Sequence, residues 1–446
     1  MMSKIGKYGL GAMLLAAAAP LSAQLIGGTG GLLGPVGGAV DRTLGAVTGP
    51  VTGPITGSPS ASGADAPVVS LDHVAPSLGT AVSSASSLLE LRRLRIDSFI
   101  RSNRDTLDRD PDGAPVRRSA LVLIDPQAAD LDQLASAGFR TVRDEQADGL
   151  GIHMVTMTPP KGMNVRDAAK RVAKIAPGVQ FDFDHIYEPA GGALDPVAGK
   201  LAAAVPFRPG TRIAMIDGGM ASHPSLSRAS IEQRGFAGPA QPTGHGTAVG
   251  SLLVGSDGVF RGAAQGANLF VGDVYGGNAA AGSATVIVRA LAWAVSKRPS
   301  VINISLVGPA NAVLKRAIDA VRARGIAVVA AVGNDGPAAP PQYPAAYPGV
   351  IAVTAVDGGD RALREAGRAA HLDFAAPGAD LAAALPGKGY TVVRGTSFAS
   401  PLVAARLAAV GNVGALMGEA VPGKGKVGNG IICKSCRIAP RSVGIK

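Results

Sequence analysis

The segment TRIAMIDGG, residues 211–219, is the clearest indication of the fold class. Its apolar part, IAMI, predicts a strand, and Asp217 and two glycines follow at once. A strand without polar alternation is typical of a parallel sheet covered on both faces, because neither face of the strand meets water. Similar segments span residues 268–274, 301–306, 326–333 and 350–356.

Helical patterns separate these segments, for example over residues 284–296 and 312–324. Strands that alternate with helices predict an α/β fold with a parallel sheet and helices on both faces. We expect KVGNGII, residues 426–432, as its last strand. Active sites in such sheets lie at the carboxyl ends of the strands.

Three polar residues occupy such places. Asp217 ends the first strand, His245 lies between two glycines at the start of a predicted helix, and Asn334 follows the strand at 326–333. Each residue has an ordinary interpretation when it is taken alone. The aspartate and the asparagine suit turns, and the histidine suits a turn or a helix cap.

A fourth candidate, Ser397, lies in RGTSFASPLVAA, residues 394–405. The small residues after it suit close helix packing, and Pro401 is tolerated only in a first turn. We therefore expect Ser397 at a helix N-terminus, where its ordinary role is a cap. In the chain order Asp217, His245, Ser397, however, these residues supply an orienting acid, a base and a nucleophile for acyl transfer.

The same site would include an oxyanion hole. The side-chain amide of Asn334 and the backbone N–H of Ser397 are the expected donors to the oxyanion. The chain order excludes the α/β-hydrolase plan, which runs Ser, Asp, His and needs a G-x-S-x-G turn that GTSFA does not provide.

Five segments, AMIDGGM, GHGTAVGSLL, VINISL, AAVGNDGP and GTSFASPLVAA, resemble the signature blocks of the subtilisin-like serine peptidases. The match spans about residues 208–410. The resemblance implies a seven-stranded parallel sheet with flanking helices and hydrolysis of peptide bonds in protein or peptide substrates. It assigns Asp217, His245 and Ser397 to the catalytic triad and Asn334 to the oxyanion hole.

The resemblance also implies a substrate-binding wall made of Ser305, Leu306, Val307 and Gly308. Two departures from the family pattern stand out. Gly218 replaces the Thr or Ser that usually follows the aspartate, so a hydroxyl that could support the carboxylate is lost. Val307 replaces a glycine, and its branched side chain is expected to narrow the cleft.

The chain in front of this region follows a different pattern. Residues 119–188 predict the order β-α-β-β-α-β, which is the ferredoxin-like arrangement. Many exported members of the family carry a ferredoxin-like propeptide that assists folding and blocks the cleft. We expect this part to be an intramolecular inhibitor that is cut off somewhere between Glu188 and Pro206.

The N-terminus predicts export. Lys4 and Lys7 precede an apolar run over residues 10–19 and a small-residue cleavage site after Ala23, and no later segment is apolar over a bilayer's width. We expect a protein that is secreted or periplasmic, without a stable membrane span when mature. The predicted parts are a signal peptide (1–23), a Gly/Pro-rich spacer (24–83), an amphipathic helix and linker (84–118), the propeptide-like domain (119–190), a linker with the processing site (191–207) and the catalytic domain (208–446).

Charge and cysteine content limit the partners. The net charge is +11, but Lys and Arg are scattered and not interleaved with aromatic residues, so we expect no nucleic-acid partner. Cys433 and Cys436 favour a local disulfide over free thiols or a redox-active pair. They cannot close a zinc site alone, and we expect no metal and no cofactor. Structural calcium is common in the family but cannot be read from this sequence.

Two other functional classes stay open at this stage. One is an inactive binding protein that keeps the fold while the altered DGG and SLVG blocks prevent turnover. The other is a nucleic-acid or surface binder that uses the basic C-terminal part, which would show salt-sensitive binding.

Overall fold

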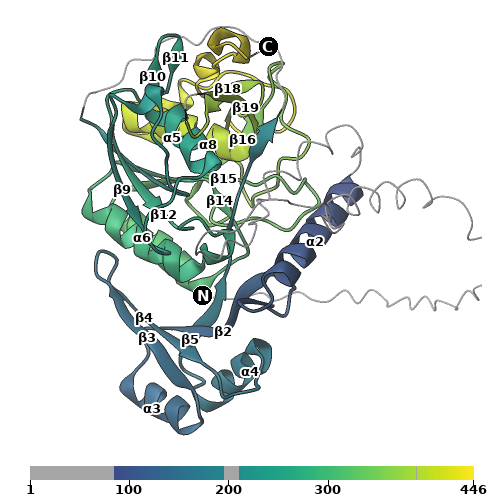
Figure 1. Cartoon of the computed structure of the whole chain (residues 1–446), viewed down its shortest axis with the longest axis vertical. Coiled ribbons are helices and arrows are strands. Elements are labelled where there is room, and N and C mark those ends of the chain that lie inside the picture. The colour runs from purple at the N-terminus through teal and green to yellow at the C-terminus, as the bar shows by residue number, and fades with distance from the viewer. Residues whose placement is uncertain (1–84, 195–209, 388, 446) are drawn as a thin grey trace, which may run out of the picture. The chain divides into compact units, whose positions relative to one another are not determined.

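The computed structural model describes residues 85–194, 210–387 and 389–445 (Figure 1). These residues belong to one compact unit, residues 67–446. The predicted signal peptide and spacer lie outside the described residues, as does most of the predicted linker at 191–207. Among the described residues, no helix is both long and apolar enough to cross a membrane.

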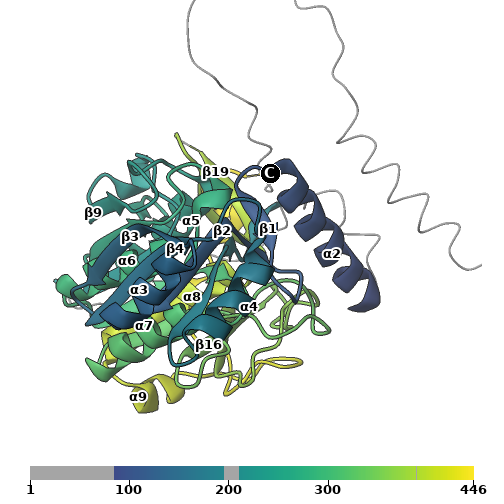
Figure 2. The same ribbon diagram turned by 90° about the horizontal axis from the view of Figure 1, so that it is seen from below.

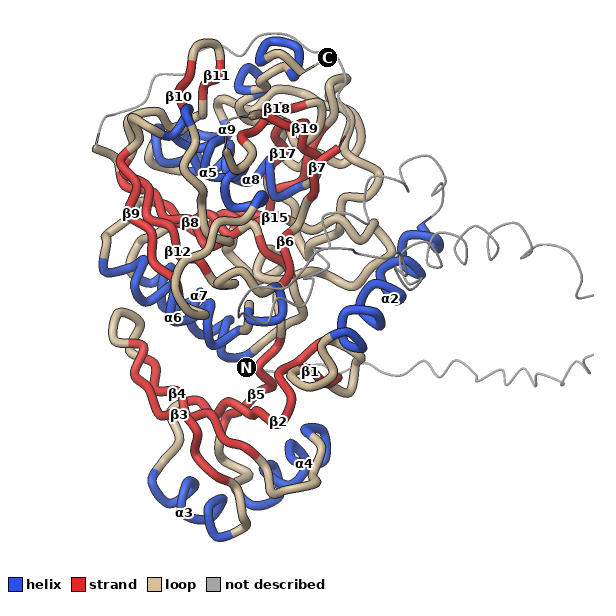
Figure 3. The backbone as a smooth tube through the Cα atoms, viewed as in Figure 1, coloured by secondary structure: helices blue, strands red, loops and turns tan. Residues whose placement is uncertain are grey.

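A seven-stranded sheet forms the centre of the C-terminal part (Figure 3). Its order is β17-β16-β15-β13-β8-β12-β9, and every neighbouring pair is parallel. The strands are β8 (Arg212–Asp217), β9 (Ser230–Gly235), β12 (Asn268–Asp273), β13 (Val301–Ile304), β15 (Ala327–Ala331), β16 (Ile351–Val356) and β17 (Phe374–Pro377). The predicted α/β fold with a seven-stranded parallel sheet is therefore confirmed.

The expected strand at residues 426–432 is wrong. Within the described residues, its only pairing with the sheet is an isolated bridge between Ile431 and Ala375 of β17. Gly428 and Gly430 have φ angles of 63° and 134°, which an extended strand does not contain. The chain turns at these glycines, and β17 itself is the last strand on that edge.

Helices cover both faces of the sheet. On one face lie α5 (Gly244–Val254) and α8 (Thr396–Val410), and on the other lie α6 (Ala284–Ser296) and α7 (Ala312–Ala323). Strand β8 shows why its sequence does not alternate. Ile213 and Met215 belong to the core under α5 and α8, whereas Ala214 and Ile216 belong to the core under α6 and α7.

Short elements surround this core. They are β10 (Ser256–Asp257), β11 (Phe260–Arg261), β14 (Leu306–Val307), β18 (Leu381–Ala384), β19 (Tyr390–Arg394) and α9 (Val413–Met417), with 3-10 turns at Pro224–Leu226, Ala279–Ala281, Lys434–Cys436 and Pro440–Val443. In the C-terminal tail, Cys433 and Cys436 are joined by a disulfide.

The N-terminal part is a five-stranded antiparallel sheet that follows a helix, α2 (Ala85–Ser102). Strand β1 (Leu107–Arg109) pairs with β2, and the other strands lie in the order β3-β4-β2-β5. From β2 onward the elements agree with the predicted order: β2 (Pro115–Ile124), α3 (Ala128–Ser136), β3 (Arg140–Ala147), β4 (Ile152–Thr158), α4 (Val165–Ile175) and β5 (Gln180–His185).

Both faces of this antiparallel sheet are covered (Figure 2). Helices α3 and α4 cover one face, with Leu123 and Val155 among the buried residues. The other face packs on α6 and α7, where Val122 and Met154 share a core with Leu291. The N-terminal sheet therefore buries one of its faces against the C-terminal part of the chain.

Candidate active site

Asp217, His245 and Ser397 meet at the carboxyl end of the parallel sheet. Asp217 is the last residue of β8, and the other two are the second residues of α5 and α8. His245 Nδ1 lies 2.8 Å from Asp217 Oδ1, and His245 Nε2 lies 2.9 Å from Ser397 Oγ. The carboxylate favours the tautomer with its proton on Nδ1, which leaves Nε2 to accept the serine proton. All three side chains are buried.

The two carboxylate oxygens of Asp217 differ in their hydrogen bonds. Asp217 Oδ1 accepts from His245 and from the Gly218 backbone N–H, at 2.6 Å, while the buried Oδ2 has no partner among the described atoms. A serine or threonine at position 218 could have supplied the missing donor, but Thr243 prevents it. A Cβ on Gly218 would overlap Thr243 Oγ1, which caps α5 by accepting from the Gly246 N–H at 2.9 Å.

A hydrogen bond from the backbone orients the side chain of Asn334. The loop after β15 carries it, and its Oδ1 accepts from the Thr396 N–H at 3.1 Å. The oxygen is therefore occupied, and Nδ2 is directed to the carbonyl oxygen of Ala190. The Ser397 N–H donates to the same oxygen at 3.0 Å. Two donors thus converge on one carbonyl oxygen beside the serine hydroxyl.

The start of α8 corrects one expectation. The helix begins at Thr396, so Pro401 is its sixth residue and does not lie in the first turn. Proline lacks the N–H that would bond to the carbonyl oxygen of Ser397. The hydroxyl of Ser305 donates to that oxygen instead, at 3.0 Å, which explains how the helix tolerates the proline.

The chain's own segment Ile186–Leu194 crosses this site. Before Ala190 it pairs antiparallel on both sides, through an isolated bridge from Ile186 to Ser283 and through β6 (Glu188–Pro189) with β14. After Gly191 it continues as β7 (Gly192–Leu194), which pairs antiparallel with β19. The bond between Ala190 and Gly191 lies at the serine, and a Cβ on Gly191 would overlap Ser397 Oγ.

The four residues expected to form the substrate wall lie along this segment. Ser305 accepts from the Ala190 N–H through its backbone oxygen at 3.1 Å, whereas its side chain is buried under α8 and does not face the segment. Leu306 and Val307 form β14, opposite Pro189 and Glu188.

The last wall residue, Gly308, leaves room for an aromatic ring. A Cβ there would lie 2.5 Å from the ring of Tyr187. The phenol of Tyr187 donates to the carbonyl oxygen of Pro309 at 2.8 Å, and its backbone N–H donates to Gly282 at 2.8 Å. The side chain is fully buried.

Comparisons with known proteins agree with this geometry. Residues 208–416 match the sequence profile of the subtilase family. Subtilisin Savinase of Lederbergia lenta is 36% identical over 212 residues, which are 45% of this chain and 76% of Savinase. The chain belongs to the subtilase family. Members of this family are serine endopeptidases, and the predicted enzyme class is confirmed.

Two other similarities of this subtilase cover a smaller share of the relative's own length. An alkaline protease of Shouchella clausii is 36% identical over 212 residues, and this chain covers about half (54%) of its length. Fervidolysin from Fervidobacterium pennivorans, a keratinolytic enzyme related to subtilisin, has a TM-score of 0.61 at 18% identity, over 74% of this chain and 63% of fervidolysin. At that identity the similarity concerns the fold alone.

Several residues at the site carry no motif that identifies them. Thr243 and Thr396 act through neighbours, and Ala190 and Gly191 are two small residues in a loop-like stretch. The local signal in this stretch was the glycine pair Gly191 and Gly192, which follows β5 by five intervening residues. Glycine is typical of places where another group comes close to the backbone.

Proposed function

We propose that this subtilase is exported as an inactive precursor and cuts its own chain between Ala190 and Gly191, after which it cleaves proteins and peptides. One observation carries the proposal. The carbonyl oxygen of Ala190 accepts from both Ser397 N–H and Asn334 Nδ2. Ser397 Oγ lies against Gly191, the residue after Ala190. This is the arrangement in which a peptide carbonyl is attacked.

The mechanism follows from the positions of these atoms. Ser397 Oγ attacks the carbonyl carbon of Ala190 while His245 Nε2 takes its proton. The two donors stabilise the oxyanion, and one such donor typically contributes about 3 kcal/mol. His245 then gives the proton to the Gly191 nitrogen, and the C–N bond breaks. Water releases the acyl group from Ser397 in the same way, with Asp217 stabilising the charged imidazole.

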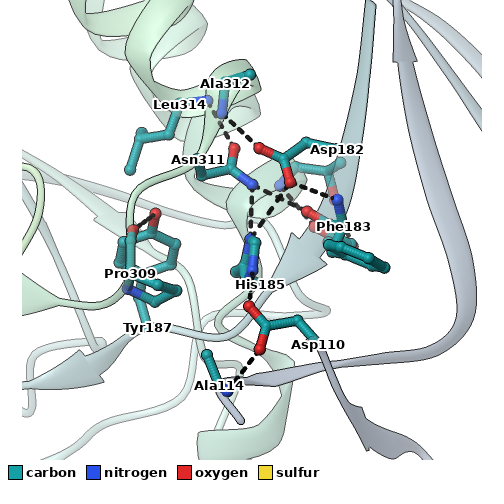
Figure 4. Close-up of polar contacts among 12 residues, drawn as sticks. Asp110, Ala114, Asp182, Phe183, His185, Tyr187, Pro309, Asn311, Ala312 and Leu314 are labelled. Atoms are coloured by element: carbon teal, nitrogen blue, oxygen red, sulfur yellow. Dashed lines mark hydrogen bonds and ion pairs between the residues drawn. The ribbon is translucent and has the colours of Figure 1, made fainter. Parts of the chain in front are cut away.

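Residues 85–190 would act as an intramolecular inhibitor. Their last residues occupy the part of the cleft that binds the substrate residues before the cleaved bond. A polar cluster fixes them to the N-terminus of α7 (Figure 4). Asp182 Oδ2 accepts from the Ala312 N–H at 2.7 Å, and His185 Nδ1 accepts from Asn311 Nδ2 at 2.9 Å. The carboxylate of Asp182 also lies where the helix dipole favours negative charge.

The orientation of Asn311 leaves the histidine one arrangement. Asn311 Oδ1 is occupied by the Leu314 N–H at 2.9 Å, so its Nδ2 must face His185. His185 Nδ1 is therefore an acceptor, and Nε2 donates to Asp110 Oδ2 at 3.0 Å. Asp110, His185 and Asn311 are buried, and the cluster has a defined hydrogen-bond direction, which supports a specific and lasting contact.

The segment in the cleft also suggests what substrates fit. Ala190 packs against Val307 and Ala331, so the branched side chain of Val307 leaves space for a small residue before the cleaved bond. Tyr187, three residues earlier, fills a site beside Gly308. We expect the mature enzyme to prefer a small residue directly before the bond and an aromatic residue three positions further toward the N-terminus.

A test separates an enzyme from an inactive binding protein of the same fold. Wild type, Ser397→Ala and the control Ser227→Ala, an exposed serine of the same domain, are treated with a serine-directed phosphonate and assayed on casein. The proposal predicts labelling and casein cleavage in wild type and in the control only. A folded wild type that is neither labelled nor active, even after limited trypsin treatment, would contradict it.

A further inference from the structure

Two hydrogen bonds hold the backbone on either side of Asn334. On one side, the Gly367 N–H donates to the carbonyl oxygen of Gly333 at 2.8 Å. On the other side, the Gly336 N–H donates to the carbonyl oxygen of Glu365, also at 2.8 Å. Gly333 and Gly336 have positive φ angles, 87° and 84°. Because glycine has the largest backbone freedom, the loop that carries Asn334 depends on such bonds for a fixed shape.

The side chain of Glu365 connects this loop to the strand that precedes the nucleophile. Arg394 is the last residue of β19. Its Nε lies 2.6 Å from Glu365 Oε1, and its Nη2 lies 3.0 Å from Glu365 Oε2. Two parallel bonds of this kind fix the orientation of the two groups as well as their distance. The side chains are 34% and 22% exposed, so the pair is partly shielded from water.

These contacts close a ring around the two oxyanion donors. The Thr396 N–H donates to Asn334 Oδ1 at 3.1 Å, and the Gly333 N–H donates to Thr396 Oγ1 at 3.0 Å. Glu365 binds the loop of Asn334 through its backbone and binds β19 through its side chain. The segments that carry Asn334 and Ser397 are therefore joined directly and also through Glu365.

The precursor has a further support that the mature enzyme would lack. Arg92 and Arg95 of α2 lie 3.0 and 2.8 Å from the carboxylate of Asp335, in the same loop. Both arginines belong to the part that would leave after self-cleavage, whereas Glu365 belongs to the part that stays. The contribution of Glu365 should therefore be measured in the mature enzyme.

We propose that Glu365 is a positioning residue of the mature enzyme, which together with Arg394 keeps the Asn334 amide directed at the oxyanion. This inference rests on the proposed function. Removal of one oxyanion donor typically lowers kcat by about a hundredfold or more, so a donor that stays but is less well directed should lower it by about tenfold. KM should change by less than about twofold, because the contact is made mainly in the transition state.

The test measures kcat and KM of the self-matured full chain on Tyr-Glu-Pro-Ala-nitroanilide, which has the sequence of residues 187–190. Glu365→Gln keeps the shape of the side chain and removes its charge. The matched control is Glu419→Gln, which breaks another two-bond ion pair, that with Arg406 of α8. We expect kcat to fall about tenfold in Glu365→Gln and to stay at the wild-type value in the control. Arg394→Lys keeps the charge but not the two-bond geometry, and it should lie between them.

A double substitution separates positioning from a general loss of stability. In Asn334→Ala no amide is left to direct, so the addition of Glu365→Gln should lower kcat by less than about twofold. A merely structural role of Glu365 would instead lower kcat by the same factor with and without the Asn334 amide.

Three results would overturn the inference. They are an unchanged kcat in Glu365→Gln, a loss of equal size in Glu419→Gln, and a full tenfold loss on the Asn334→Ala background. Should Asn334→Ala not mature, the comparison with Glu419→Gln decides, and Arg394→Lys replaces Glu365→Gln if that variant does not fold. A wild type that hydrolyses no peptide defeats the proposed function and this inference together.

Discussion

The segment in the cleft is held differently on the two sides of the bond between Ala190 and Gly191. Before the bond, side chains are anchored: Tyr187 is fully buried and Glu188 is paired with Arg95. After the bond, glycine and alanine follow, and β7 pairs with β19 through its backbone. Cutting this bond should therefore leave the N-terminal half bound as an inhibitor, while the new N-terminus is free to move away.

Enlarging Gly191 should have the largest effect, because it acts at the bond itself. A valine side chain would overlap Ser397 Oγ and meet the ring of Phe398, so the nucleophile or the segment must move. A displacement of about 1 Å can cost about a hundredfold in rate. We expect Gly191→Val to slow self-cleavage by about a hundredfold, measured by gel densitometry during refolding.

The control for this variant is Gly178→Ala in the N-terminal domain, where an added Cβ meets nothing within 4 Å. It should mature at the wild-type rate. Normal cleavage of Gly191→Val at the same bond would show that the segment does not lie at the serine as described.

Removing the anchor before the bond should come next in size. Tyr187→Ala loses a buried ring and the hydrogen bond to Pro309. Buried aromatic anchors of interfaces typically contribute at least about 2 kcal/mol, or about thirtyfold in affinity. We expect a cleaved propeptide with this change to inhibit the mature enzyme about thirtyfold more weakly, measured as an inhibition constant on a nitroanilide peptide.

Val142→Ala is the matched control, because Val142 lies in the same domain and is 58% exposed. Its inhibition constant should stay at the wild-type value. An equal loss in both variants would mean that inhibition depends on the general stability of the domain and not on this anchor.

Changing the polar cluster at the N-terminus of α7 should give the smallest effect, and the size of this effect should depend on pH. Burial raises the pKa of Asp110, but hydrogen bonds from His185 and from the Ala114 backbone outweigh it and hold this pKa below its ordinary value. An acid with a lowered pKa stabilises the folded state above its ordinary pKa of about 3.9, and this stability is lost as the pH falls through the lower, folded value.

Asp110→Asn should therefore destabilise the Ser397→Ala precursor by about 1–2 kcal/mol at neutral pH, and the difference should shrink below about pH 4. Urea unfolding at several pH values, followed by the fluorescence of the single tryptophan, Trp293, measures it. The exposed Asp132 provides the control variant Asp132→Asn. A difference that is constant from pH 7 to pH 3 would contradict the assigned role of the ionised carboxylate.

The sequence predicted the strands whose type follows from a local apolar pattern. Strands such as β8 and β16 contain almost unbroken apolar runs because both of their faces are buried, so their type could be predicted without the fold. Strand β9 was missed because SIEQRG lies at the edge of the sheet and alternates between exposed and half-buried residues. Strand β17 was missed because it has only four residues.

The same distinction holds at the site. Asp217, His245 and Ser397 stand in motifs that each combine a turn or helix start with a reactive side chain, so they could be named from the sequence. The bond at Ala190 could not, because its place depends on pairing with β14, more than a hundred residues away.

The most direct test is the position of the self-made cut. Wild type and Ser397→Ala are refolded under identical conditions without other proteases, and the products are identified by intact mass and N-terminal sequencing. Wild type should yield a C-terminal fragment that begins at Gly191, and Ser397→Ala should stay whole. A wild-type fragment that begins at another residue, or a Ser397→Ala precursor that is cut at the same bond, would contradict it.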